Sequence, residues 1–584
     1  MRNLDQAHTK THFSAHPYRS AAEWNGRRAE LRQQILASAG LLPLPPKTPL
    51  LAQRSARQEH DGYAVEKVVL QPLLGFFLAG NLYTPLHRGP RAAAVLIAHG
   101  HWKHGRAHQA EDYSVPALAA NLARQGFVAF AHDMVGYNDT RQLRHDFGDS
   151  AEERRWAFSP LGLQLWNCIR ALDFLQSLPE VDPRRLAVTG ASGGGTQTIL
   201  LAAVEDRIRV SVPVDMVSAN FQGDDACEMA PGLRIGTNNV EIAALVAPRP
   251  MMLVSSTKDW TKHTPDEEFP AIRSIYHLYG AQDRVTLHHV DAPHNYNHAS
   301  RAGVYAFLHR HLRARMPGVD KMQERPTQLP PEALLLDEPI KPGSAVGGQV
   351  AGGPKEIFEQ WKTMAQLQVQ ELPRETLREA LRATIGAQWP RHVTSYNVGN
   401  RQVLERDGAG ERIPARWLNG PGEGTTVVAT RSGAESGAAL KLAGLWLSRS
   451  SRLLLIDVYQ TGQAVTAREP LRGDHLTFHR SDDAARVQDI MTALAAAATD
   501  RGQPVTLVCD QDSYWWCATA TALAPVPVTL GGTVTGTDVG SADWTQHLAI
   551  PGLVRLGGWA SIRRLLPRPD AARPPDSPPS LIDY

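Results

Sequence analysis

Cysteine is scarce in this sequence, and long apolar runs are missing from it. The four cysteines among the 584 residues are Cys168, Cys227, Cys509 and Cys517. Because no two of them form a Cys-x-x-Cys pair, the sequence predicts buried thiols rather than a structural zinc or a disulfide framework. No apolar run reaches the roughly 18 residues that span a bilayer, and residues 1–5 lack the pattern of a secretory signal. We expect no membrane partner, and the compartment stays open: the cell interior by default, or export if a leader has been removed.

An excess of charge of one sign is also missing. Lys and Arg number 61 against 59 Asp and Glu, which gives a formal net charge of +2. The positive charges are scattered among acidic residues, so no basic stripe is available to neutralise a phosphate backbone, and we expect no nucleic-acid partner. At 584 residues, of which 42% are hydrophobic, the chain is too long for one compact core, which favours two domains. The oligomeric state is left open.

The region from residue 92 to residue 290 alternates apolar runs with amphipathic segments of helix length. The apolar runs are Ala92–Ala98, Phe127–Ala131, Leu186–Thr189, Val210–Pro213, Met251–Ser255 and Val285–Val290. This alternation is typical of β-α-β units, so it predicts an α/β fold with a mainly parallel sheet covered on both faces. Before this region we expect a helix from Ala21 to Ala39 and strands at Ala64–Leu70 and Phe77–Tyr83.

The second half of the chain repeats this pattern in weaker form, after a segment rich in Pro and Gly. We predict strands at Thr425–Ala429, Arg452–Val458 and Pro504–Cys509, with a helix at Ala484–Thr499 before the last of them. These strands and this helix follow one another in the same order as in the first half. We therefore predict a catalytic domain with an N-terminal extension at residues 1–316, a linker at 317–354, and a diverged copy of the same fold at 355–584.

A glycine-rich turn, Gly190-Ala191-Ser192-Gly193-Gly194, directly follows a predicted strand and precedes a predicted helix. A Gly-x-Ser-x-Gly turn in this context is the nucleophile elbow of an α/β-hydrolase, in which small neighbours permit a strained serine backbone. The alternative is a βα turn that only packs. At the corresponding place the second half has Asp510-Gln511-Asp512-Ser513-Tyr514, without glycines. We identify no histidine in a loop after the last predicted strand of the copy that could partner such a turn. We expect that α/β-hydrolase-like copy to be inactive.

A serine hydroxyl needs a base and an orienting carboxylate, and in this fold both follow later strands in the order Ser, acid, His. Asp259 follows the run Met251–Ser255, and His294 follows Val285–Val290, so these two residues are our predicted acid and base. His298 is the alternative base, since His288 and His289 lie within the predicted strand. The alternative acids are Asp266, Glu267, Glu268, Asp224, Asp225 and Glu228.

The loop after the first strand of the alternating region, His99-Gly100-His101-Trp102, is the predicted source of an oxyanion-binding N–H group. We expect the N–H of Gly193 to be one donor and that of His101 or Trp102 to be the other. Histidines 99, 101, 104 and 108 also suggest a metal site, but no carboxylate lies at metal-ligand spacing, so we expect neither a metal nor a cofactor. The candidate substrate-binding residues are Trp102, Trp260 and Glu228.

Residues from about Gly80 to Leu312 resemble the acetyl-xylan-esterase-like α/β-hydrolases, relatives of carbohydrate esterases and, more distantly, of the prolyl-oligopeptidase catalytic domain. The motifs that carry the resemblance are Thr189-Gly190-Ala191-Ser192-Gly193-Gly194-Gly195-Thr196-Gln197-Thr198, Pro231-Gly232-Leu233-Arg234-Ile235-Gly236-Thr237-Asn238-Asn239, Lys258-Asp259-Trp260-Thr261-Lys262 and Asp291-Ala292-Pro293-His294-Asn295-Tyr296-Asn297. The resemblance implies hydrolysis of acetyl or methyl esters on polysaccharides, with the triad carried by Ser192, Asp259 and His294.

Three functions are consistent with these observations. The first is a serine esterase that removes acetyl or methyl groups from a polysaccharide or oligosaccharide through an acyl-enzyme intermediate. The second is a serine peptidase of the prolyl-oligopeptidase type acting on short peptides, which is weakened because the peptidase relatives carry a long propeller before the hydrolase and this N-terminal region is short. The third is a binding protein on an inactive hydrolase scaffold, which is disfavoured because all triad members occur in order.

Overall fold

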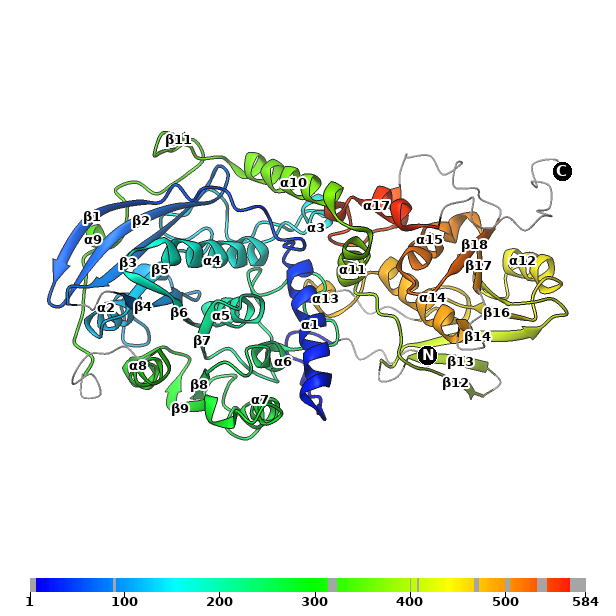
Figure 1. Ribbon diagram of the computed structural model, residues 1–584, viewed down its shortest axis with the longest axis horizontal. Helices are drawn as coiled ribbons and strands as arrows, with labels where there is room; N and C mark the ends of the chain where they lie inside the picture. Colours follow the sequence, from blue (N-terminus) through cyan, green and yellow to red (C-terminus); the bar gives the residue numbers. More distant parts are fainter. Residues whose placement is uncertain are drawn as a thin grey trace. The chain divides into compact units, whose positions relative to one another are not determined.

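The computed structural model describes residues 7–87, 91–312, 323–399, 401–406, 409–466, 472–498, 505–532 and 544–567. The chain divides into two compact units, with the boundary between Ala365 and Gln366. Each unit contains its own β-sheet (Figure 1). None of the described helices combines the length and the apolar character that crossing a bilayer requires.

The first unit has a nine-stranded sheet with the order β1-β2-β3-β5-β4-β6-β7-β8-β9. Its strands are β1 (Gln53–His60), β2 (Tyr63–Leu73), β3 (Phe76–Pro85), β4 (Ala92–Ala98), β5 (Val128–His132), β6 (Val181–Ala191), β7 (Ile208–Val214), β8 (Met251–Lys258) and β9 (Val285–Pro293). The strands β1, β2, β3 and β5 pair antiparallel, and every pairing from β5 through β4 to β9 is parallel. This is the sheet of an α/β-hydrolase, as the sequence predicted.

Helices cover both faces of this sheet. The helices of the first unit are α1 (Ala21–Ser38), α2 (Val115–Arg124), α3 (Ala151–Arg155), α4 (Pro160–Ser177), α5 (Gly193–Val204), α6 (Asn239–Ala244), α7 (Glu268–His277), α8 (His298–Leu312) and α9 (Pro331–Leu334). Helix α10 (Pro354–Glu371) begins in the first unit and contains the boundary. Side chains of α1, α4, α5 and α6 pack in one core with Ala94 and Leu96 of β4. Side chains of α2, α8 and α9 pack in another core with Val95 and Ile97. Because successive strand residues point to opposite faces, the apolar β4 run contributes to both cores.

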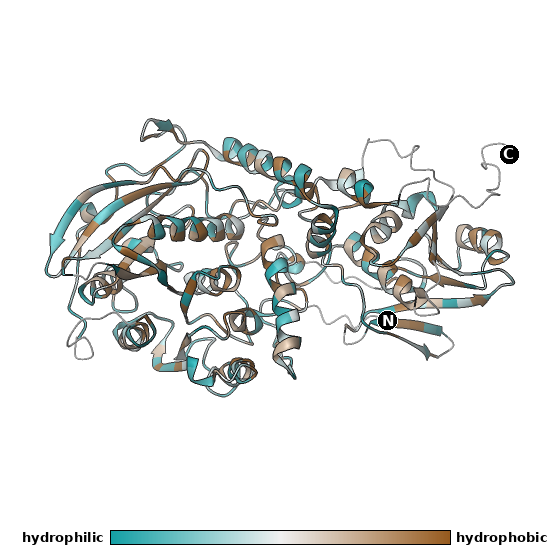
Figure 2. Ribbon diagram, in the orientation of Figure 1, coloured by the Kyte–Doolittle hydropathy of each residue, from teal (hydrophilic) through white to brown (hydrophobic). Residues whose placement is uncertain are grey.

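The outer strand of this sheet differs in character from the inner ones. β1 is mostly exposed and hydrophilic, whereas every residue of β4 is buried and apolar, a contrast that Figure 2 shows by colour. A polar edge strand discourages pairing with other chains.

The predicted linker is described from residue 323 onward. Its residues 323–353 belong to the first compact unit. Leu329 and Leu334 join the core with α2 and α8, and Ile340 and Ala351 pack on Phe77 of β3. The first unit thus extends about fifty residues past the predicted domain end, because apolar side chains between the prolines are buried on the sheet. This segment includes the short strands β10 (Ala345–Val346) and β11 (Gln349–Val350).

The second unit repeats most of the topology of the first. Its strands are β12 (Val393–Val398), β13 (Arg401–Arg406), β14 (Arg412–Asn419), β15 (Thr425–Ala429), β16 (Arg452–Ile456), β17 (Val505–Cys509) and β18 (Val528–Gly532), in the order β12-β13-β14-β16-β15-β17-β18. Its helices are α11 (Arg374–Ile385), α12 (Gly437–Leu447), α13 (His475–Phe478), α14 (Asp482–Ala498), α15 (Tyr514–Leu523), α16 (Trp544–His547) and α17 (Gly558–Leu565).

The strand order and the pairing directions of this sheet equal those of β1 through β7 in the first unit. In the described parts of the second unit, no strand corresponds to β8 or β9. The copy therefore stops before the strands that carry the predicted acid and base.

Candidate active site

Ser192 lies in the turn between β6 and α5, and its backbone is strained. Its φ of 59° and ψ of −127° fall in a region that residues with side chains rarely adopt. The Ser192 N–H donates to the carbonyl of Val214 on β7 at 3.1 Å, which ties the turn to the sheet. A β-carbon added at Gly194 would lie 2.1 Å from the Ala98 carbonyl oxygen, so only glycine permits α5 to approach β4 this closely. This geometry is that of a nucleophile elbow.

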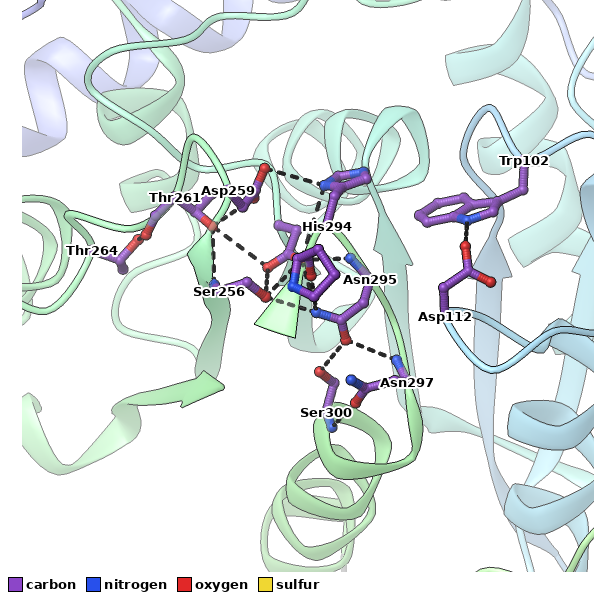
Figure 3. Close-up of polar contacts among 12 residues, drawn as sticks. Trp102, Asp112, Ser256, Asp259, Thr261, Thr264, His294, Asn295, Asn297 and Ser300 are labelled. Carbon is purple, nitrogen blue, oxygen red and sulfur yellow. Dashed lines mark hydrogen bonds and ion pairs between the residues drawn. The ribbon is translucent and has the colours of Figure 1, made fainter. Parts of the chain in front are cut away.

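Asp259 and His294 meet at the carboxyl ends of neighbouring strands. Asp259 directly follows β8 and His294 directly follows β9, and the distance from Asp259 Oδ1 to His294 Nδ1 is 3.3 Å (Figure 3). The Asp259 side chain is 1% exposed, and its other oxygen accepts a hydrogen bond from Thr261 Oγ1 at 2.7 Å. A buried carboxylate that faces Nδ1 would orient the imidazole and leave Nε2 for proton transfer. The structure thus brings together the predicted acid and base.

A second carboxylate, which the sequence analysis missed, lies beside the same histidine. Asp215 directly follows β7, is fully buried, and has Oδ2 4.0 Å from His294 Nδ1. Burial, together with the nearby charge of Asp259, raises the pKa of Asp215 to about 7. The available signal was an aspartate at the end of the strand that follows the elbow.

Hydrogen bonds fix Asp215 in this position. Ser256 Oγ donates to its carboxylate at 2.9 Å, and the Asn295 N–H donates at 2.9 Å. The Asn295 side chain also donates to Ser256 Oγ at 2.8 Å and accepts from Ser300 Oγ at 2.8 Å (Figure 3). This network joins the ends of β7, β8 and β9 with the start of α8, so it holds the loop that carries His294.

The predicted oxyanion loop borders the elbow. A β-carbon added at Gly100 would lie 2.9 Å from Ser192 Cβ, and one added at Gly193 would lie 2.6 Å from Cε1 of His101. The loop and the first residue of α5 are thus packed directly against each other. Gly193, His101 and Trp102 thus lie beside the turn that contains Ser192.

Two tryptophans pack against the His294 ring. Trp102 stacks on it with ring centroids 5.3 Å apart and an interplanar angle of 5°, and Trp260 lies 4.4 Å from it. Trp102 Nε1 donates to Asp112 Oδ2 at 2.6 Å, which fixes the indole (Figure 3). Both indoles are partly exposed and form walls of the site, where an aromatic face is available to a ligand.

The alternative bases occupy other environments. His298 is exposed at the start of α8. His288 Nε2 contacts the Ala299 carbonyl at 3.0 Å, and His289 Nδ1 contacts Ser255 Oγ at 2.7 Å, so both rings have structural partners.

The alternative acids also have other partners or positions. Glu228 is 3% exposed and accepts hydrogen bonds from the N–H groups of Asp224 and Asp225 at 3.1 and 3.2 Å. Glu268 accepts from the Ala219 N–H at 2.7 Å, and Glu267 pairs with His12. Among the described residues, the carboxylates within 4.0 Å of His294 are Asp259 and Asp215. Glu228, predicted as a substrate contact, fastens the loop that contains it.

The histidines at 99, 101, 104 and 108 do not gather around one point. His99 is buried and accepts a hydrogen bond from the Met134 N–H at 2.9 Å, and burial lowers its pKa to about 3. The rings of His104 and His108 stack on each other with centroids 6.2 Å apart. His101 belongs to a different cluster, described below.

The second unit has no elbow at the equivalent turn. Ser513 is fully buried and has a φ of −97°, and its Oγ lies within hydrogen-bond distance of two acceptors, the Ala429 carbonyl at 2.9 Å and Asp510 Oδ1 at 2.5 Å. These bonds close the turn between β17 and α15. The Ser513 hydroxyl thus has hydrogen-bond partners within the turn and is not exposed to solvent.

Comparison with known proteins gives a family model and several sequence relatives. Residues 165–225, which contain the elbow, match the family model described as acetyl xylan esterase (AXE1). The protein described as "Putative hydrolase YtaP" of Bacillus subtilis is 27% identical over 282 residues, which cover 44% of this chain and 90% of that protein. A 4-O-methyl-glucuronoyl methylesterase of Cerrena unicolor is 23% identical over 211 residues, which cover 36% of this chain and 41% of that relative.

Solved structures with a similar fold include esterases. Methylesterase BT1017 has a TM-score of 0.48 and 28% identity, with 59% of this chain and 78% of that chain covered. A glucuronoyl esterase from Solibacter usitatus has a TM-score of 0.39 and 16% identity, with 51% and 94% covered. The family match and the sequence relatives, taken together, identify the chain as an esterase of the α/β-hydrolase fold that is similar to the acetyl xylan esterases and other carbohydrate esterases.

Proposed function

We propose that this esterase is a serine carboxylic-ester hydrolase in which Ser192 is the nucleophile, His294 the base and Asp259 the orienting acid. The observation that carries the proposal is the combination of a strained serine in the β6–α5 turn with an Asp–His pair 3.3 Å apart at the ends of β8 and β9. This order and these strand ends are those of an α/β-hydrolase triad.

The reaction proceeds by two acyl transfers. His294 Nε2 takes the proton of Ser192 Oγ as the oxygen attacks the ester carbonyl, and Asp259 stabilises the imidazolium that forms. The N–H of Gly193 and that of His101 or Trp102 stabilise the oxyanion. The imidazolium then protonates the departing alcohol, and the same histidine activates the water that hydrolyses the acyl-enzyme.

The substrate in this proposal is an acetyl or methyl ester on a polysaccharide or oligosaccharide. The acetyl xylan esterase family model and the methylesterase relative support a carbohydrate ester of one of these two kinds. The two indoles beside His294 supply flat apolar faces of the kind that pack against ligand rings.

A substrate panel tests this proposal. Purified protein would be assayed with a chromogenic acetyl ester, acetylated xylo-oligosaccharides, methyl-esterified uronic acid oligosaccharides and a chromogenic dipeptide amide. We expect turnover of the chromogenic ester and of one carbohydrate class, with labelling of Ser192 by a serine-directed phosphonate. Turnover of the amide alone would replace the esterase with a peptidase, and no turnover or labelling would contradict the serine mechanism.

Replacement of the orienting acid should lower kcat severely. Asp259→Asn keeps the shape of the side chain but cannot hold His294 in the tautomer that accepts the serine proton, so kcat should fall about 10⁴-fold. Steady-state kinetics on the chromogenic ester would measure this. If Asp259→Asn were mild and Asp215→Asn crippling, the orienting acid would be Asp215, the other carboxylate beside His294.

Asp215→Asn should act mainly on the pH dependence of stability. A carboxyl whose pKa rises to about 7 on folding keeps its proton in the folded state while the unfolded chain loses it, so its stabilising contribution is complete below about pH 4 and disappears as the pH rises to about 7. The asparagine variant cannot ionise and lacks this loss. The melting temperature of the wild type should therefore fall relative to that of Asp215→Asn between pH 5 and pH 8. A constant difference would mean that Asp215 is ionised throughout this range.

A further inference from the structure

We propose that the first unit binds a divalent zinc ion through His101, His145, Asp225 and Cys227. His101 lies in the loop after β4, His145 in the loop after β5, and Asp225 and Cys227 in the loop after β7. One ligand atom from each lies within 4.8 Å of every other. The binding does not depend on the proposed triad, because none of the four residues belongs to it.

The separations match those of ligands around one ion. His101 Nε2 lies 3.2 Å from His145 Nε2 and 3.2 Å from Cys227 Sγ. The Asp225 carboxylate lies 3.2 Å from His145 Nε2 and 3.6 Å from His101 Nε2. Zinc–nitrogen bonds of about 2.0–2.1 Å and zinc–sulfur bonds of about 2.3 Å place tetrahedral ligand atoms roughly 3.3–3.7 Å apart. The four groups thus need only small shifts to surround the ion.

The hydrogen bond of His145 Nδ1 leaves the other ring nitrogen, Nε2, available to a cation at this point. Its Nδ1 lies 2.7 Å from the Val135 carbonyl, so this nitrogen carries a proton, and in the neutral ring Nε2 presents a lone pair to the cluster. An imidazole held by a backbone carbonyl through its second nitrogen is the usual arrangement of a metal-binding histidine. One cation at this point would contact both imidazole nitrogens, the carboxylate and the sulfur together.

The donor set identifies the class of metal. Two imidazoles, one carboxylate and one thiolate form a mixed nitrogen, oxygen and sulfur set that suits zinc and does not suit magnesium or calcium, which prefer oxygen. The thiolate and carboxylate would together offset the charge of the ion. Four protein ligands leave no open position for a substrate, so the ion would have a structural role.

The loops that the ion would join are parts of the active site. His101 belongs to the predicted oxyanion loop and its ring faces Gly193. Asp225 and Cys227 lie in the segment after β7, whose backbone Glu228 already fastens. The ion would therefore hold the oxyanion loop and this segment in one arrangement.

The test measures metal binding directly. Full-length protein would be stripped with a chelator, titrated with Zn²⁺, and analysed by elemental mass spectrometry and by differential scanning calorimetry. We expect one zinc per chain, a higher melting temperature on binding, and at least a hundredfold weaker binding in His145→Gln and Cys227→Ser. The matched control, His104→Gln with His108→Gln, alters the neighbouring histidine pair and should bind zinc like the wild type.

Cobalt replacement tests the sulfur ligand without relying on the folding of a variant. Wild-type protein loaded with Co²⁺ should show the near-ultraviolet absorption of thiolate-to-cobalt charge transfer, and Ser192→Ala should show it unchanged even if the proposed function fails. The proposal is overturned if no stoichiometric zinc binds, if the cobalt protein lacks the thiolate band, or if binding is lost in the His104 and His108 control and kept in Cys227→Ser.

Discussion

Ser192→Ala should reduce kcat for ester hydrolysis by roughly 10⁶-fold, to the residual rate supplied by substrate binding and oxyanion stabilisation. The alanine lacks the oxygen that forms the acyl-enzyme, so the loss cannot be recovered at higher substrate concentration. The fold should persist, because the turn is held by the Ser192 N–H bond to Val214 and by the glycines that let α5 approach β4. Steady-state kinetics, together with a melting curve like that of the wild type, would measure both effects.

Ser513→Ala is the matched control for this variant. Ser513 occupies the equivalent turn of the second unit, where its hydroxyl is buried and bonded to the backbone. Its replacement should lower stability and leave kcat within a few-fold of the wild type. An active Ser192→Ala protein would remove the serine assignment, and an inactive but folded Ser513→Ala protein would show that the second unit takes part in catalysis.

The inner strands of the sheet could be predicted from sequence because their apolar runs are continuous. The run Ala92–Ala98 is β4 without any shift, and Met251–Ser255 lies within β8. β1 was missed because its eight residues, Gln53–His60, contain no apolar run: an edge strand is held by backbone pairing with β2. The end of the first unit was misplaced because residues such as Ile340 become buried only through a tertiary contact with the sheet.

The candidate site was predictable where chain order determines position. Parallel strands end at the same edge of a sheet, so residues that follow β6, β8 and β9 had to lie near one another. Chain order alone does not predict that Asp215, as well as Asp259, lies near His294. The position of the Asp215 carboxylate depends on hydrogen bonds from Ser256 and Asn295. The cluster of His101 with His145 was equally hidden, because it depends on how the loops fold over the sheet.

The strands of the second unit were also predictable from apolar runs, but its described part lacks the last two strands of the first unit. Thr425–Ala429 and the strand ending at Cys509 were predicted from apolar runs and are β15 and β17. The described part of the copy contains no counterpart of β8 or β9, which in the first unit carry Asp259 and His294. We propose that this unit is catalytically silent, since a turn without an elbow and a sheet without those strand ends provide neither nucleophile nor base.

His294→Ala should reduce kcat almost as much as Ser192→Ala, because a serine hydroxyl without its base does not form the acyl-enzyme at a useful rate. The losses should not add: the double variant should be about as slow as either single variant, since nucleophile and base act as one unit. Rate measurements on the two single variants and the double variant form the cycle that checks this. A double variant slowed by the product of the two effects would mean that His294 acts separately from Ser192.

His298→Ala distinguishes the base from its neighbour. His298 is exposed at the start of α8, whereas His294 faces the buried carboxylates of Asp259 and Asp215, so the His298 variant should retain nearly full kcat. Melting curves for both variants would separate a loss of fold from a loss of catalysis, because the His294 ring also packs against Trp102 and Trp260. If His298→Ala were the inactive protein and His294→Ala the active one, the carboxylates beside His294 would serve only to hold its loop. The base would then have to reach Ser192 from the first turn of α8.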